Sequence, residues 1–268
     1  MIKCNGLYLL VMLITTLILT SVCYGDIVTK GLVAYWSLDA GTIKGDTVSD
    51  IVGKNDGVMK GKPKPIAGKI NEALEFDGTN SVDINGTDAL NFNGKEELTV
   101  SAWINPKNAE PVVGVVAGCC GTIIAQRDAN GWALRFDGRN ANSEFEFIVC
   151  PGWQGDGGFG ATKNKVKPGE WHYLTGVVAK KVMRVYLDSE MIVEGPFSGP
   201  IASNGPETEI GKAGDGGFIG IIDEVAIYDR ALNDNEIKQN FESKRFFAVN
   251  WQNKLATCWG NIKYREKE

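Results

Sequence analysis

Hydrophobic and polar residues alternate one by one in several short segments of the chain. The clearest examples are residues 132–137, 144–149 and 183–188. A period of two places successive side chains on opposite faces of a strand, so each segment is expected to bury one face. Turn dipeptides such as Asp77-Gly78 and Asn130-Gly131 separate the segments, because glycine and asparagine tolerate positive φ. This pattern predicts an all-β, two-sheet antiparallel sandwich.

One helix is predicted, and the sequence marks where it begins. Asn233 is expected to be the N-cap, and Glu236 completes a capping box three residues later. Leu232 and Ile237 occupy the two positions of a hydrophobic staple, which fixes the angle at which the chain enters the helix. The helix is expected to end near Ser243, and no helical periodicity precedes residue 234.

Several ordered segments together carry a family resemblance. They are GLVAYWSLD at 31–39, NDGV at 55–58, ALEFDG at 73–78, LTVSAWI at 98–104, GEWHY at 169–173 with VYLD at 185–188, and the strand-to-helix segment 217–237. In this order they resemble the laminin-G-like, concanavalin A-like jelly-roll domains of secreted and cell-surface proteins. The resemblance covers residues 31–243 and implies a jelly-roll sandwich with one short C-terminal helix.

The two ends of the chain have their own expected roles. Residues 1–25 read as a secretory signal, with Lys3 followed by an apolar run and cleavage near Gly25. We therefore expect a secreted or cell-surface protein whose mature chain does not insert into a membrane. Residues 26–243 are expected to form the jelly-roll domain. Residues 244–268 are expected to form a hairpin docked on it, because their apolar content argues against a solvated tail.

The charge of the chain argues against nucleic acid as a partner. Lys and Arg number 28 and Asp and Glu 33, which gives a net charge of −5. Removing residues 1–25 removes one basic residue, so 27 minus 33 leaves −6. Nucleic-acid binding depends largely on neutralising phosphates with Lys and Arg. We expect carbohydrate or an extracellular protein as the partner.

Four cysteines remain after residue 25, and an exported protein favours disulfides. A bond between the neighbours Cys119 and Cys120 would be strained, so one is expected to pair with Cys150 and the other with Cys258. If residues 122–127, 131–136 and 144–149 form a meander, Cys120 and Cys150 lie at opposite ends, about 20 Å apart at ~3.3 Å per residue. Only the flanking loops could close that distance. Reduced thiols are the alternative.

Three long Gly- and Pro-rich loops, residues 106–121, 151–169 and 195–217, are expected at the rim of the sandwich, where jelly rolls commonly bind ligands. The middle loop carries Trp153, Asp156 and Phe159, which could stack on a sugar ring and hydrogen-bond its hydroxyls. The alternative is that Trp153 caps the end of the sandwich, since large aromatic residues are mostly buried.

A structural calcium ion is the cofactor that the resemblance implies. Related domains often hold one near the sandwich edge, and the matching positions here are Asp77, Gly78 and Asp223. Strand parity would place Asp223 on the core side with Val225 and Ile227, where a carboxylate needs a metal or hydrogen bonds. The alternative is that Asp223 accepts backbone N–H groups without a metal.

Catalytic motifs are absent from the sequence. His172 is the only histidine, and no nucleophile motif accompanies it. The concanavalin-like glycoside hydrolases carry a Glu-x-Asp-x-(x)-Glu arrangement, and Glu144-Phe145-Glu146 lacks the third acid. We expect a non-catalytic binding module that acts through its rim loops. A structural or adhesive surface component is the alternative, and a glycoside hydrolase of another type is the third.

Overall fold

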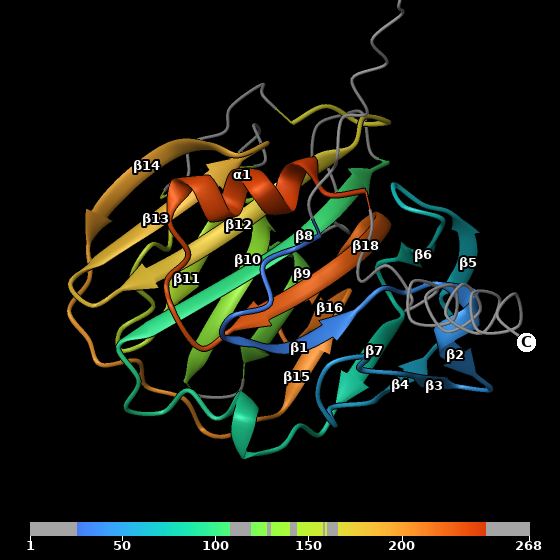
Figure 1. Cartoon of the computed structure of the whole chain (residues 1–268), viewed down its shortest axis with the longest axis horizontal. Coiled ribbons are helices and arrows are strands. Elements are labelled where there is room, and N and C mark those ends of the chain that lie inside the picture. The colour runs from blue at the N-terminus through green and yellow to red at the C-terminus, as the bar shows by residue number, and fades with distance from the viewer. Residues whose placement is uncertain are drawn as a thin grey trace, which may run out of the picture.

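In this computed structural model, two β-sheets are stacked on each other (Figure 1). Alternate side chains from both sheets meet between them and form the core. The structure describes residues 26–107, 119–127, 130–139, 144–157, 159 and 166–244. Within these residues the strands pair antiparallel, except for one parallel pairing between Gly217 and Thr122. The predicted all-β jelly-roll sandwich with one C-terminal helix is therefore confirmed.

One sheet has eight strands, in the order β14-β13-β12-β8-β18-β6-β5, with β1 also paired to β18. Its strands are β1 (Leu32–Trp36), β5 (Lys64–Ala67), β6 (Glu72–Asp77), β8 (Glu97–Pro106), β12 (His172–Ala179), β13 (Val182–Leu187), β14 (Glu190–Pro196) and β18 (Ile219–Tyr228).

The other sheet has ten strands, in the order β11-β10-β9-β15-β7-β4-β3-β2, and β16 and β17 join it beside β9. Its strands are β2 (Ile43–Lys44), β3 (Thr47–Val48), β4 (Gly57–Lys60), β7 (Ser81–Ile84), β9 (Cys120–Arg127), β10 (Gly131–Asp137), β11 (Glu144–Val149), β15 (Thr208–Ile210), β16 (Lys212–Ala213) and β17 (Gly216–Gly217). The predicted meander corresponds to β9, β10 and β11. Short 3-10 helices lie at Ala40–Thr42 and Asp88–Leu90.

Large aromatic side chains fill the space between the sheets. Phe136 stacks on Phe218 with ring centroids 6.1 Å apart, and Phe92 meets Trp132 edge to face at 6.3 Å. All four side chains are buried, and they come from β10 and from the connecting segments before β8 and β18. The inward positions of β10 and β11 are the hydrophobic members of the alternating segments, as the sequence predicts.

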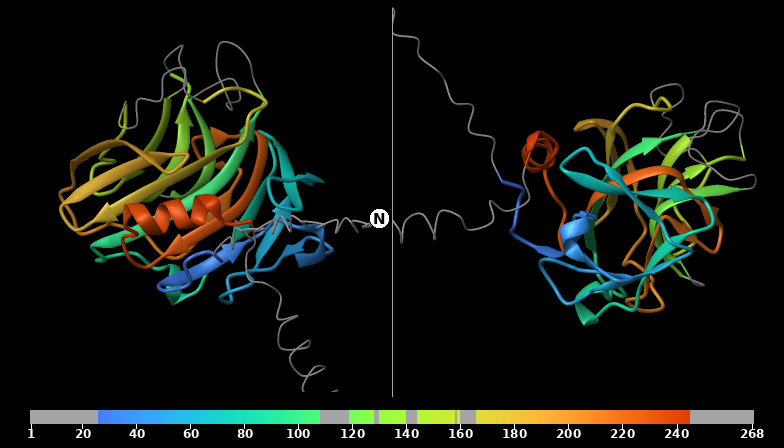
Figure 2. Two further views of the ribbon diagram at one scale, coloured as in Figure 1. Left: turned by 45° about the horizontal axis from the view of Figure 1, so that its top comes forward. Right: turned by 90° about the vertical axis from the view of Figure 1, so that its right-hand side faces the viewer.

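The α-helix α1 (Asp234–Glu242) covers the outer face of the eight-stranded sheet (Figures 1 and 2). Its predicted start is confirmed, because the side chains of Asn233 and Glu236 make both bonds of the capping box. Under the helix lies a second buried cluster that includes Trp103, Tyr173 and Tyr228. The helix therefore covers the part of this outer face that carries these aromatic residues.

The predicted signal at residues 1–25 and hairpin at 245–268 lie outside the described residues, so both stay predictions. In the part of the chain that is described, no helix has the length and apolar character needed to cross a bilayer.

Asn240 joins α1 to the segment that precedes β1. Its Oδ1 accepts a hydrogen bond from the backbone N–H of Val28 at 2.8 Å, and its Nδ2 donates to the Tyr228 hydroxyl at 3.0 Å. Because both partners are buried, we expect Asn240→Ala to lower the free energy of unfolding by about 2 kcal/mol. Lys238→Ala, on the exposed side of the helix, should change it by less than about 0.5 kcal/mol. Urea denaturation measures both, and equal effects would contradict this role of Asn240.

Candidate functional site

The outer face of the ten-stranded sheet differs from the helix-covered face of the other sheet. One row of residues crosses this face at the same level on six neighbouring strands. From β4 to β11 the row is Val58, Asp83, Glu209, Ala125, Ala133 and Ile148. After Val58 the row has two carboxylates and then three apolar side chains, so a polar area and an apolar area lie side by side.

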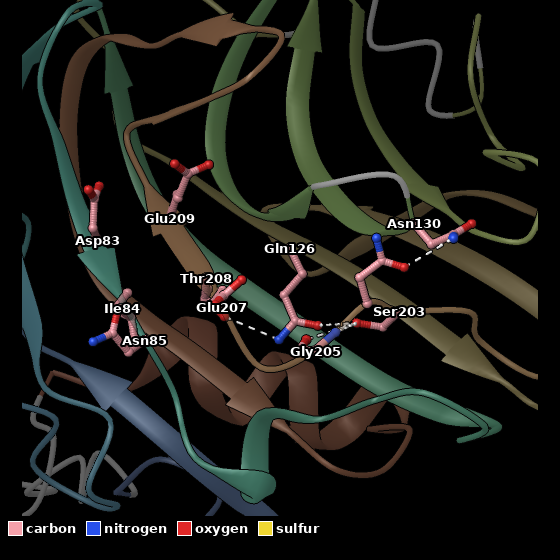
Figure 3. A pocket seen from close by; sticks show the side chains of 11 residues that line it. Asp83, Ile84, Asn85, Gln126, Asn130, Ser203, Gly205, Glu207, Thr208 and Glu209 are labelled. Carbon is pink, nitrogen blue, oxygen red and sulfur yellow. Dashed lines mark hydrogen bonds between the residues drawn. The ribbon is translucent and has the colours of Figure 1, made fainter.

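A polar cavity of about 320 Å³ lies at the polar end of this row (Figure 3). Its lining includes the side chains of Asp83, Asn85, Gln126, Asn130, Ser203, Asn204, Glu207, Thr208 and Glu209. The strand β7, the end of β9 and the segment 203–209 supply these residues. They lie far apart in the sequence, and only the pairing of β15 with both β7 and β9 brings them together.

Gln126 forms the fixed inner wall of the cavity. Its Nε2 donates to the carbonyl oxygen of Leu90 at 2.7 Å and to the Thr208 hydroxyl at 3.2 Å. Its Oε1 accepts from the indole N–H of Trp132 at 2.9 Å and from the Ser203 hydroxyl at 3.2 Å. Since the Gln126 amide is fully engaged, the cavity has a rigid wall that needs no ligand to order it.

Two carboxylates project from neighbouring strands beside the cavity. Asp83 and Glu209 are direct cross-strand partners, and both side chains extend to the same side of the sheet (Figure 3). Asp83 accepts a hydrogen bond from the Ser81 hydroxyl at 2.6 Å. Burial raises the pKa of Glu209, the neighbouring Asp83 charge adds to the increase, and Lys212 opposes it. The pair therefore presents hydrogen-bond acceptors at a partly desolvated surface.

Farther along the same outer face, a buried arginine joins three carboxylates. The Nε of Arg135 lies 2.7 Å from Glu146 Oε1, and its Nη2 lies 2.7 Å from Asp156 Oδ1. Its Nη1 contacts Asp215. The side chain of Arg135 is only 2% exposed and that of Glu146 is 0% exposed. These contacts hold the segments that carry Asp156 and Asp215 against β10 and β11.

A second arginine extends this cluster toward solvent. Arg139 Nη2 lies 2.7 Å from Asp137 Oδ2 and also contacts Asp156. Burial raises the pKa of Glu146, an effect that Arg135 opposes. Asp137, Glu146 and Asp156 lie close enough together to share a cation. Both guanidinium groups already occupy this acidic cluster, so its carboxylates are engaged within the protein.

The three predicted contact residues do not form one shared exposed surface. Trp153 is half-buried and packs on the apolar end of the row, against Ala125, Ala133 and Ile148. Asp156 is held by both arginines, and Phe159 packs against the main hydrophobic core. This packing places Trp153 on the outer face of the sheet, whereas the capping alternative placed it over the end of the sandwich. Its place on the same face as Asp83 and Glu209 still makes it a neighbour of the cavity.

The predicted calcium ligands are not brought together. Asp77 pairs with Ile219 in the register of β6 and β18, and Asp223 lies four residues farther along β18. At ~3.3 Å per residue, the two backbone positions are about 13 Å apart, which is too far for one ion. The Asp77 carboxylate instead accepts hydrogen bonds from the backbone N–H and hydroxyl of Thr79, in the turn that contains Gly78.

A β-bulge also overturns the predicted side for Asp223. The register of β18 against β8 shifts between Asp223 and Ala226, and Glu224 has a φ of +52°. Asp223 is therefore paired with Trp103 on the outer face, whereas Val225 points into the core. The prediction assumed unbroken alternation, and one extra residue in the strand shifts it by one position.

Asp223 is nevertheless an unusual carboxylate. Its Oδ2 accepts hydrogen bonds from the backbone N–H groups of Lys69 at 2.8 Å and Ile70 at 3.0 Å. Its Oδ1 is buried and has no hydrogen-bond partner. Burial raises the pKa of Asp223 to about 8, and the charge of Asp39 adds to the increase. The acidic neighbour of Asp223 is thus Asp39, which follows β1, rather than Asp77.

The predicted disulfide pairing is wrong for the described cysteines. Cys119 and Cys120 are bonded to each other, and Cys150 is a buried free thiol. The expected separation is confirmed by the register, since Cys120 pairs with Asp137 at one end of β10 and Cys150 follows Val149 at the other. Cys150 is therefore out of reach of Cys120. Cys258 lies outside the described residues.

The remaining acidic and basic candidates have structural partners. His172 is buried, and its Nδ1 lies 2.9 Å from Asp188 Oδ2. Glu146, which belongs to the incomplete hydrolase motif, is paired with Arg135. Neither side chain is placed as a free acid or base.

The fold and the sequence together define the family. A family profile described as "Concanavalin A-like lectin/glucanases superfamily", Laminin_G_3, matches residues 76–238. The chain belongs to this superfamily. A search of curated proteins gave no match.

Solved structures with the same fold include sugar-bound and toxin domains. Domain 4 of AbnA, a GH43 extracellular arabinanase from Geobacillus stearothermophilus solved with arabinotriose, has a TM-score of 0.61 and 21% identity, over 78% of this chain and 97% of that one. The binding domain of Paraclostridial Mosquitocidal Protein 1 has a TM-score of 0.59 and 17% identity, over 79% of this chain and 52% of that one.

The binding domain of Botulinum neurotoxin DC, solved with rat synaptotagmin II, has a TM-score of 0.56 and 15% identity, over 81% of this chain and 52% of that one. The chain therefore spans about half of either toxin domain. At these identities, the likeness to all three structures shows a shared fold.

Sequence reasoning missed the polar cavity and the arginine cluster. Alternation places Asp83, Arg135 and Glu209 on outward positions, which is a usable signal. It does not reveal that β15 lies between β7 and β9, and that pairing assembles the cavity.

Arg135 is expected to be essential for this outer face. Arg135→Met would leave Glu146 buried without its partner, so we expect the free energy of unfolding to fall by about 3 kcal/mol. Arg184→Met removes an exposed pair with Glu194 and should cost less than about 1 kcal/mol. Denaturation by guanidinium chloride compares the two variants. Similar losses would show that the cluster does not stabilise the fold.

Proposed function

We propose that this chain is an exported, non-catalytic module that binds carbohydrate on the outer face of the ten-stranded sheet. The single observation that carries the proposal is the polar cavity at Asp83, Gln126 and Glu209, open to solvent and bounded by a rigid wall. The helix α1 packs on the other outer face, whereas no α-helix of the described residues packs on this one.

The chemistry of the cavity suits a sugar. Its lining is mostly amide, hydroxyl and carboxylate, and these groups can hydrogen-bond the many hydroxyls of a glycan. Ala125 follows Glu209 in the row and Ala133 follows Ala125, with strands about 4.8 Å apart. Trp153 packs on these alanines, so it can border a bound sugar at the apolar end.

The solved structures support a binding role in general terms. The AbnA domain was solved with arabinotriose, and the neurotoxin domain was solved with synaptotagmin. The latter favours recognition of an extracellular protein as the second candidate. The adjacent carboxylates Asp83 and Glu209 favour testing hydrolysis as well, because retaining glycosidases use two carboxyl groups about 5 Å apart.

A glycan array on the full-length secreted protein, followed by titration of the best oligosaccharide, tests the proposal. The double variant Asn85→Ala, Asn204→Ala should bind at least about tenfold more weakly, because two amides that can hydrogen-bond the glycan are lost. Lys60→Ala, on β4 outside the cavity lining, is the control and should bind as the parent does.

Three results would change the assignment. Glycan binding that survives in the double variant would place the sugar elsewhere. Capture of a protein without any glycan would favour the second candidate. Turnover that Asp83→Asn or Glu209→Gln abolishes would identify a hydrolase.

The variant Trp153→Ala tests whether Trp153 contacts the glycan or only packs on the sheet. Loss of glycan binding without loss of thermal stability would make Trp153 a contact residue.

We also propose that Asp223 holds a calcium ion, with ligands other than the predicted Asp77 and Gly78. The buried Oδ1 without a hydrogen-bond partner fits an oxygen ligand of calcium, and Asp39 is a second acid whose charge acts on Asp223. The role of such an ion would be to stabilise the contact between β18 and the segment that contains Lys69 and Ile70.

Thermal unfolding with calcium and with a chelator tests this proposal. We expect calcium to raise the midpoint by several degrees, because an ion that binds only the folded state stabilises it. Asp223→Asn should abolish that increase, whereas Asp77→Asn should retain it. An unchanged midpoint in the parent protein would show that Asp223 is satisfied by the backbone N–H groups alone.

A further inference from the structure

A small cavity lies between the outer face of the eight-stranded sheet and α1, remote from the proposed sugar site. Its volume is about 10 Å³, which corresponds to one water molecule or one ammonium group. Its walls are mainly aromatic, with Tyr35, Trp103, Tyr173 and Tyr228 on the sheet side. Glu224 is the one carboxylic acid among the described lining residues.

Glu224 is held in this cavity at a cost. The residue is 4% exposed, and its Oε2 is buried without a hydrogen-bond partner. Its backbone adopts a φ of +52° in the bulge of β18, which is the left-handed region that a glutamate rarely occupies. An unpartnered buried carboxyl group and a strained backbone are both unfavourable, and they concentrate at ligand sites.

A larger open space adjoins this cavity. It has a volume of about 420 Å³ and is lined by residues that include Lys69, Phe241 and Glu242. Ile70 and Trp103 line both spaces and therefore separate them. The Nζ of Lys69 lies 4.1 Å from the ring centroid of Trp103, so this aromatic wall already carries an ammonium group on its solvent side.

We propose that these two spaces form a binding site for a primary alkylammonium group. The ammonium occupies the small cavity beside Glu224, and the alkyl chain extends between Ile70 and Trp103 into the larger space. The carboxyl group accepts a hydrogen bond from the ammonium group at its unpartnered Oε2, and the surrounding rings add cation–π attraction. Entry requires a side-chain rotation at Ile70 or Trp103.

The size of the small cavity determines which ammonium groups the site accepts. A space for one water molecule accepts an –NH₃⁺ group, whereas a trimethylammonium group is several times larger. The site is therefore expected to discriminate between n-butylammonium and choline. The same chemistry is present in a free amine and in a lysine side chain, and a comparison with Nα-acetyl-lysine amide distinguishes these two sources.

Titration calorimetry of the full-length protein at neutral pH, with n-butylammonium as the probe, tests the site. We expect Glu224→Gln to weaken binding at least about tenfold, because a charge-assisted hydrogen bond is lost while the shape of the side chain is kept. Glu170→Gln is the matched control, since this acid is 56% exposed and lines neither space. Its binding should be nearly unchanged.

Two further variants keep the test decisive if Glu224→Gln alters folding. Ala226 lines the small cavity, so Ala226→Val should fill it and abolish binding. Lys69→Met should strengthen binding severalfold, because it removes a competing cation from Trp103. Equal binding of choline and n-butylammonium, or full binding by Glu224→Gln, would overturn the site. No binding by the parent protein would also overturn it and would show that the cavity holds an ordered water only.

Discussion

Burial of alternate side chains between two sheets is the constraint from which the other features follow. Once Trp132, Phe136 and Phe218 are enclosed, every second residue of each strand must point away from the core. The two sheets differ in which residues point outward and in what covers these residues. The eight-stranded sheet places aromatic residues outward and covers them with α1. The ten-stranded sheet places charged and small residues outward, and connecting segments cover only part of them. Its uncovered part is the proposed sugar site.

The bulge in β18 is the one place where the alternation changes. Without it, Asp223 would point outward and Glu224 inward, into the core. The extra residue turns the glutamate outward as well, so that two acids with raised pKa values lie side by side under covering segments. The left-handed backbone at Glu224 is the local cost of this arrangement. Both the calcium proposal and the ammonium proposal therefore depend on one irregular residue pair.

The sequence predicted those parts of the structure that depend on local pattern. The meander of β9, β10 and β11 and the capping box of α1 follow from residue type and spacing, and the structure has both. The predicted set of calcium ligands and the predicted disulfide pairing were wrong for different reasons. Asp77 and Asp223 lie in the same sheet, but the register of β6 and β18 places them at different positions along the strands. Cys119 bonds to its neighbour because Cys150 lies at the far end of the meander. Contacts between β7, β9 and β15 depend on strand order, which no local pattern in this chain encodes.

The acids on the ten-stranded sheet show why the polar cavity, rather than the acidic cluster, is the better candidate for a ligand. Asp137, Glu146 and Asp156 are all engaged by Arg135 or Arg139. A ligand there would have to displace a guanidinium group from a site in which the paired charges are buried, and breaking such a pair is costly. Asp83 and Glu209 have no arginine partner among the described residues, and each faces the other across the strands. Hydrogen bonds from sugar hydroxyls would relieve that mutual repulsion, so ligand binding removes an unfavourable interaction at the cavity instead of creating one.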